Sequence, residues 1–184
     1  IHIKCGVCDE YGRFTDFLKD LLIFYTSEDS MHSLKEYVDA MPESQKAIYY
    51  ASADTVKHAM ALPQCEEVRS RGYEILYLDH PIDETVLQQL RMYEGKGFVN
   101  ILTEDLGFQT DEEKKAAAEK VVENKELLDF IRDSIGDEKL KQVTLSSKLV
   151  SSACCLTSTG GFTLEMEKYL RNGPSEEMRK LRDD

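Results

Sequence analysis

Apolar residues near the start of the chain recur at helical spacing. In residues 13–25 they stand three or four positions apart, as on one face of an amphipathic helix: Phe14, Phe17, Leu18, Leu21, Leu22 and Tyr25. Ser33 followed by Glu36 has the form of a capping box, which predicts that a second helix begins there. This helix should end near Met41, because Pro42 disfavours helical backbone at the residue before it.

The next part of the chain alternates between short apolar runs and helical patterns. The expected elements are strands at residues 47–51, 74–78 and 97–101 and helices at residues 54–71 and 83–92, the first helix interrupted at Pro63 and closed by Gly72. Strands that alternate with helices pair in parallel through right-handed crossovers, so this order predicts the α/β class. We expect a small three-layer αβα subdomain with a short parallel sheet.

The composition changes after Thr110. Residues 111–124 are rich in Glu, Lys and Ala, which predicts a solvated helix that links two units. The elements expected after it are a more apolar helix at residues 127–136, strands at 143–150 and 153–157, and a helix at 162–170 that follows two glycines. The sequence therefore predicts a partial α+β domain after the αβα subdomain.

Charge narrows the classes of partner. The 184 residues carry 35 acidic and 23 basic side chains, a net charge of −12. This balance argues against binding to nucleic acid or to an anionic membrane, since both need clustered Lys and Arg. No apolar run approaches the roughly 20 residues that span a bilayer. Protein partners are therefore expected.

The cysteines indicate the cellular compartment, and the two ends of the chain indicate a longer polypeptide. Five cysteines, an odd number, with no signal-peptide pattern indicate reduced thiols, and we expect a cytoplasmic protein. The chain begins at Ile1, in a run (residues 1–4) that is typical of a strand, and stops at Asp184 in a charged, helix-prone run. We expect it to be part of a longer polypeptide.

Cys5-Gly-Val-Cys8 is the pattern most suggestive of chemistry. A Cys-x-x-Cys pair occurs in redox sites and in halves of zinc sites. Acidic residues follow it directly and would raise a thiol pKa, and Cys154–Cys155 lacks the spacing of a second zinc-binding pair. Two ordinary thiols at a strand end are the simpler interpretation, and a thiol-redox or zinc module using Cys5 and Cys8 is the alternative.

Other candidate sites are weaker. Gly95-Lys96-Gly97 precedes a predicted strand, whereas a phosphate loop precedes a helix, so a hairpin turn is favoured. The four histidines are scattered, and none has the spacing of a catalytic triad. We therefore expect no catalytic residue and no metal site in this chain.

The predicted helix at residues 162–170 has most of its apolar residues on one face. Its apolar positions are Phe162, Met166, Tyr169 and Leu170, with Leu164 alongside. Methionine and aromatic side chains on an exposed helix suit adaptable protein binding. The alternative is that this face packs on the strands before it, as most amphipathic faces do.

Several motifs resemble those of Hsp90 chaperones, in particular of the bacterial type. They are, in chain order, SLKEYV at 33–38, MPE at 41–43, QK at 45–46, IYY at 48–50, GYEILYL at 72–78, PIDE at 81–84, YEGK at 93–96, KLVSSACC at 148–155, GFT at 161–163 and ME at 166–167. They run collinearly over nearly the whole chain. Cys5 and Cys8 are not part of the pattern.

The resemblance implies a division into three parts. Residues 1–28 would be a helical connector of the middle domain, residues 29–109 its small αβα subdomain, and residues 110–184 the start of the C-terminal domain. The ATP-binding domain, with its ATP and magnesium, would lie outside this chain, so no cofactor is expected here. The helices that dimerise the parent would lie beyond Asp184.

The resemblance also implies binding residues. The helix at 162–170 corresponds to one that contacts unfolded or partly folded client proteins. Glu84, which ends the PIDE motif, and Thr85, which follows it, are the other expected client-binding residues, because the residues after this motif form part of the client-facing surface in bacterial members. Bacterial members often have an aromatic residue where this chain has Thr85, which weakens that expectation. Cys154 and Cys155 lie near the junction of the middle and C-terminal domains and are candidates for transmitting conformation, the simpler interpretation being two buried thiols in a strand.

Overall fold

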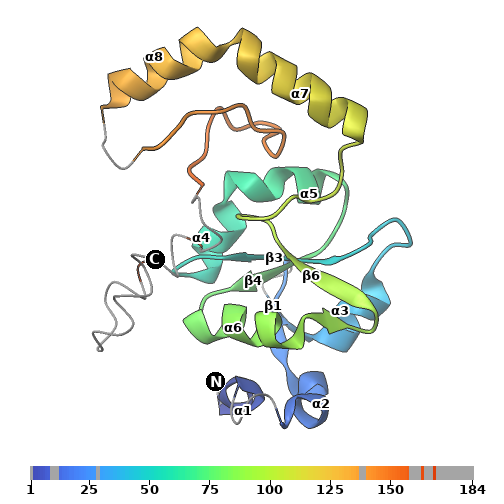
Figure 1. Cartoon of the computed structure of the whole chain (residues 1–184). Coiled ribbons are helices and arrows are strands. Elements are labelled where there is room, and N and C mark those ends of the chain that lie inside the picture. Colours follow the sequence, from blue (N-terminus) through green and yellow to red (C-terminus); the bar gives the residue numbers. More distant parts are fainter. Residues whose placement is uncertain are drawn as a thin grey trace. The chain divides into compact units, whose positions relative to one another are not determined.

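The computed structural model describes residues 2–8, 13–27, 30–136 and 140–157, together with 163 and 168 (Figure 1). The chain forms two compact units. The first comprises residues 1–104 and 148–184, and the second comprises residues 105–147. The predicted division into residues 1–28, 29–109 and 110–184 stays a prediction.

The first unit is built on a six-stranded mixed sheet with the order β2-β1-β4-β3-β6-β5. The strands are β1 (Ile23–Tyr25), β2 (Met31–Ser33), β3 (Ile48–Ser52), β4 (Ile75–Leu78), β5 (Met92–Tyr93) and β6 (Lys96–Asn100). The central strand β3 pairs in parallel with β4 and β6, as predicted, while the outer pairs are antiparallel. The α/β class is confirmed, and the antiparallel outer strands were not foreseen.

Helices cover both faces of this sheet (Figure 1). The helices of the first unit are α1 (His2–Cys8), α2 (Thr15–Leu18), the 3₁₀ turn η2 (Lys19–Leu21), α3 (Leu34–Ala40), α4 (Val56–Ala61), the 3₁₀ turn η3 (Pro63–Cys65), α5 (Glu66–Ser70) and α6 (Pro81–Leu90). Alternate residues of β3 and β4 face opposite sides, as the two-residue period of a strand requires. Ile48, Tyr50 and Leu76 belong to the core with α3 and α6. The three layers of the predicted subdomain are present.

Local signals in the sequence set several element ends. Ser33 Oγ accepts a hydrogen bond from the Glu36 amide at 3.2 Å, and the Glu36 carboxylate accepts from the Ser33 amide at 2.8 Å, so the predicted capping box is confirmed. The hairpin between β5 and β6 turns at Glu94 and Gly95, both with positive φ (47° and 76°). Two such residues form the tight turn that matches strand twist. A hairpin turn is therefore present as predicted, but it lies at Glu94 and Gly95, while Lys96 and Gly97 belong to β6.

Two predictions near the N-terminus are wrong. Residues 2–8 form a helix instead of a strand, because Lys4 and Val7 lie on one helical side and are both drawn into contacts with the unit; Val7 is fully buried. The helix predicted at residues 13–25 is replaced by α2, η2 and then β1. Leu22 and Phe24 are both buried, and their two-residue spacing suits a strand that adds to the sheet.

The strands predicted at residues 143–150 and 153–157 are also absent. No described residue between 140 and 157 lies in a helix or a strand. Apolar side chains in this stretch stay exposed, Val150 at 65% and Leu156 at 71%. Polar contacts, described below, hold residues 148–156 instead of a strand ladder.

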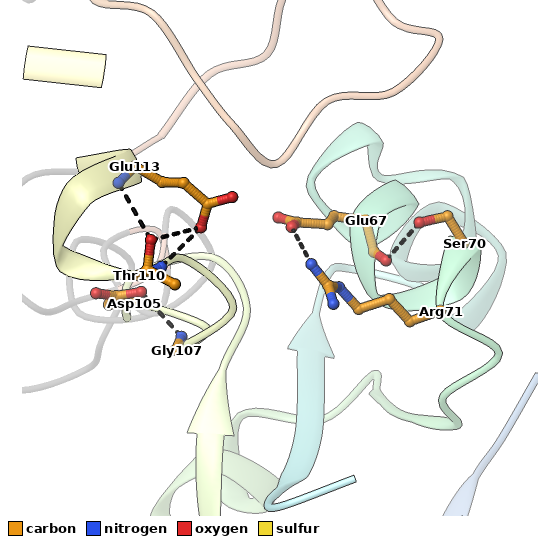
Figure 2. Close-up of polar contacts among 7 residues, drawn as sticks. All are labelled: Glu67, Ser70, Arg71, Asp105, Gly107, Thr110 and Glu113. Atoms are coloured by element: carbon orange, nitrogen blue, oxygen red, sulfur yellow. Dashed lines mark hydrogen bonds and ion pairs between the residues drawn. The ribbon is translucent and has the colours of Figure 1, made fainter. Parts of the chain in front are cut away.

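The second unit contains the two predicted helices, α7 (Asp111–Glu123) and α8 (Lys125–Ile135). Thr110 opens α7 with a second capping box, in which Thr110 Oγ1 accepts from the Glu113 amide and the Glu113 carboxylate accepts from the Thr110 amide (Figure 2). Gly136, with φ of 64°, closes α8 in the left-handed conformation. None of the helices described is long and apolar enough to cross a membrane.

Candidate functional site

The predicted client-binding face lies outside the described residues. Its five members are Phe162, Leu164, Met166, Tyr169 and Leu170. Thr163, which stands among them in the sequence, is described and fully buried. The exposure of the apolar face stays a prediction.

Glu84 and Thr85 are neighbours in helix α6 but differ in exposure. Thr85 is exposed, whereas Glu84 is 5% exposed and belongs to the interior. The Glu84 carboxylate accepts hydrogen bonds from the hydroxyls of Ser52, at the end of β3, and of Thr163, the latter at 2.9 Å. Glu84 therefore joins α6, β3 and residue 163, and of the two residues only Thr85 offers a side chain to a partner.

A buried ion pair beside Glu84 joins α1 to α6. Lys4 Nζ lies 2.8 Å from Asp83 Oδ1 and 4.3 Å from the centre of the Phe24 ring. Burial raises the pKa of Asp83, and Lys4 opposes that rise. Because Asp83 is only 2% exposed, the ammonium group of Lys4 replaces much of the water that the carboxylate loses. The pair holds the first helix on the unit.

Cys5 and Cys8 lie within helix α1, where Cys5 is exposed and Cys8 is half-buried. Burial raises the pKa of the Cys8 thiol, and Cys5 raises it further. A redox cysteine needs the opposite, a lowered pKa that favours thiolate. Among the described residues, no group of three or more His, Cys, Asp or Glu side chains is placed to hold a metal ion. The arrangement gives no support to the redox or zinc alternative.

Cys154 and Cys155 do not form the buried strand pair that was the simpler expectation. Cys154 is exposed and Cys155 is half-buried, in a stretch without regular structure. Burial raises the pKa of Cys155, with a further rise from Cys154. The buried thiol in this structure is Cys65, the last residue of η3, and burial raises its pKa to about 12. A role for Cys154 and Cys155 in transmitting conformation stays a prediction.

The residues that hold this stretch were not predicted. We call residues 148–156 the strap. Glu66, the first residue of α5, accepts hydrogen bonds from the amides of residues 150, 151 and 152 and from both serine hydroxyls. Gln64 Nε2 donates to the Leu156 carbonyl at 2.7 Å. The KLVSSACC motif marked the strap in the sequence, but no local signal marked Glu66 or Gln64, which lie more than 80 positions earlier.

These hydrogen bonds explain the ionisation of Glu66. The Ser152 hydroxyl and then the amides of Ser151 and Val150 hold the pKa of the Glu66 carboxyl well below its usual range. Donors that bind the charged form of an acid stabilise that form. Glu66 is therefore a carboxylate at neutral pH, and its charge is satisfied by the strap.

Three comparisons bear on the identity of the chain. Residues 1–182 match the family model described as Hsp90 protein. Chaperone protein HtpG of Bacillus subtilis is 42% identical over 176 residues, which are 95% of this chain and 28% of that protein. Chaperone protein HtpG of Clostridium acetobutylicum is 41% identical over 173 residues, 94% of this chain and 27% of that protein. The chain thus spans little more than a quarter of the length of these curated relatives.

A solved structure agrees with the sequence comparisons. It is described as the middle domain of a heat shock protein from Plasmodium falciparum. It superposes with a TM-score of 0.52 at 30% identity, over 56% of this chain and 44% of that one. The likeness extends from sequence to the arrangement of helices and strands.

Proposed function

Because the chain belongs to the Hsp90 family of chaperones, we propose that it is a protein-binding section of a larger chaperone and catalyses no reaction by itself. The observation that carries this proposal is the collinear match to the family over residues 1–182. The parent protein would bind ATP and magnesium in a domain outside this chain and couple hydrolysis to client remodelling. We place the parent in the cytoplasm as a homodimer.

The described polar clusters support a structural use of their charged groups. Glu84 joins α6 to β3, Asp83 joins α6 to α1, and Glu66 holds the strap. A general acid or base has to reach a substrate, whereas each of these carboxylates is already bound to another element of its own unit. Each cluster joins elements of one unit and so serves a scaffold on which a binding surface can be carried.

The client surface in this proposal is the apolar face of residues 162–170, and Thr85 is a separate candidate contact. Phe162, Met166 and Tyr169 would capture apolar segments of a partly unfolded protein. Flexible methionine and amphipathic tyrosine side chains adapt to many sequences, which suits low specificity. The net charge of −12 would keep such complexes in solution.

Replacing Phe162 and Met166 with Ser in the full-length parent tests this surface. We expect weaker binding of a permanently unfolded probe, such as reduced and carboxymethylated α-lactalbumin, with an unfolding midpoint close to that of the parent. The matched control replaces both residues with Leu, which retains an apolar face and should retain binding.

Two results would contradict the proposal. If the double Ser variant binds the probe as well as the parent does, the face is not the client surface. If its unfolding midpoint falls steeply, as after removal of core side chains, the face is part of the interior.

A further inference from the structure

The strap is attached to the first unit mainly by polar groups. Val150 and Leu156 expose most of their side chains, and Cys154 is exposed as well. An ordinary segment of a folded domain is held by buried apolar area, which is the dominant favourable term in folding. The strap therefore depends on its hydrogen bonds to an unusual degree.

Three successive backbone amides of the strap converge on one oxygen atom. The amides of Val150, Ser151 and Ser152 donate to Glu66 Oε2 at 2.7, 2.7 and 3.2 Å. The hydroxyls of the two serines donate to Glu66 Oε1 at 3.0 and 2.5 Å. Consecutive amides that point to a common centre form a concave nest for an anion.

A second contact holds the beginning of the strap. Lys148 Nζ donates to the carbonyl oxygens of Ile101 and Glu104 at 2.6 and 2.7 Å. Glu104 is the last residue of the first unit before residues 105–147, and Lys148 is the first residue after them. These hydrogen bonds therefore join the point where the chain leaves the first unit to the point where it re-enters it.

We infer that the amides of residues 150–152 form an anion-binding site whose resident ligand is the Glu66 carboxylate, and that this pairing is a releasable latch holding the strap on α5. The bound chemistry is a carboxylate, and any compact oxyanion offers the same acceptors. Val150, Cys154 and Leu156 are already exposed, so their release adds little apolar surface, and we expect the latch to open without unfolding the sheet. When the latch is open, the strap keeps the hydrogen bonds of Lys148 to Ile101 and Glu104 and that of Gln64 to Leu156.

Amide hydrogen exchange on the full chain measures the latch directly. In the unaltered chain, the amides of residues 150–152 should exchange through a local opening, faster than the amides of β3, which exchange only when the unit unfolds. Glu66→Gln should accelerate exchange at residues 150–152 by about tenfold or more and leave β3 unchanged.

Glu67→Gln is the matched control. Glu67 is the next residue of α5, and its carboxylate pairs with Arg71 at 3.2 Å (Figure 2), while the strap bonds go to Glu66. This variant removes the same charge from the same helix end. Exchange at residues 150–152 should match that of the unaltered chain.

A second variant tests the anion site itself. Glu66→Ala empties the nest, and sodium sulfate should then slow exchange at residues 150–152 relative to sodium chloride at equal ionic strength. Three outcomes overturn the inference: the strap amides exchange only together with β3, Glu67→Gln accelerates them as much as Glu66→Gln, or sulfate gives no protection to Glu66→Ala.

Discussion

Tyr37 connects four parts of the first unit through one hydroxyl group. The side chain is 2% exposed, and its hydroxyl donates to the Glu74 carbonyl at 2.5 Å, just before β4. The same oxygen accepts from Gln45 Nε2 at 2.9 Å and from the Tyr49 amide in β3 at 3.3 Å. Burial raises the pKa of Tyr37, so the hydroxyl remains protonated and able to donate.

Tyr37→Phe removes this oxygen and keeps the ring. Gln45 Nε2 retains a second bond, to the Ala47 carbonyl at 2.9 Å, but the buried Tyr49 amide and the Glu74 carbonyl lose this partner. Because a buried group left without its hydrogen bond costs about 1–3 kcal/mol, we expect a loss of roughly 2 kcal/mol in the free energy of unfolding. For a chain of this size that lowers Tm by roughly 4–8 °C.

Urea denaturation of the two proteins measures the loss. Tyr93→Phe is the comparison, since the Tyr93 hydroxyl makes one bond, to Asp20 at 2.7 Å, and the exposed Asp20 carboxylate is solvated once released. This single bond should be worth about 1 kcal/mol or less. A Tyr37→Phe loss no larger than that of Tyr93→Phe would refute the role of the Tyr37 hydroxyl as a hub.

Two further predictions concern buried groups. Lys4→Met should lower the free energy of unfolding, measured by urea denaturation, by about 3–5 kcal/mol, because it leaves Asp83 buried without its cation. Lys4→Arg keeps the cation and should lower it much less. Equal losses for the two variants would show that the ion pair is unimportant. Cys65 should resist alkylation by iodoacetamide at neutral pH while exposed Cys154 reacts, since burial raises the pKa of Cys65 to about 12. Mass spectrometry measures the rate at each thiol. Equal rates at Cys65 and Cys154 would contradict the buried position of Cys65.

Local sequence signals fixed those elements that depend on neighbours in the chain. Ser33 and Glu36 are three residues apart, so their capping box forms within one turn and can be recognised by spacing alone. The apolar runs that became β3 and β4 are buried on both faces, and such runs are typical of central parallel strands. The α/β class followed from the order of these runs.

The errors lie where a distant partner determines the local conformation. The spacing of Leu18, Leu21 and Leu22 favoured a longer helix. Yet residues 23–25 form β1, because β2 and β4 offer this strand backbone partners. Residues 2–8 became helical through contacts with α6. Helical propensity is a weak preference that such contacts override.

The candidate site shows the same division. A resemblance carried by short motifs was sufficient to indicate the family, and the comparisons confirm that indication. It also marked the strap and Glu84, but nothing in the sequence showed that Glu84 is buried against Ser52 or that Glu66 holds the strap. These pairings join residues 32 and more than 80 positions apart.

The sequence by itself therefore determined the class of fold, the helix start at Ser33 and the family. Only the tertiary structure decided which carboxylate meets which amide, because a hydrogen bond between distant residues depends on the closure of the whole chain. Periodicity and capping depend on residues that are close in the sequence. The contacts of Glu66, Glu84 and Tyr37 instead form only when the sheet and its helices have assembled.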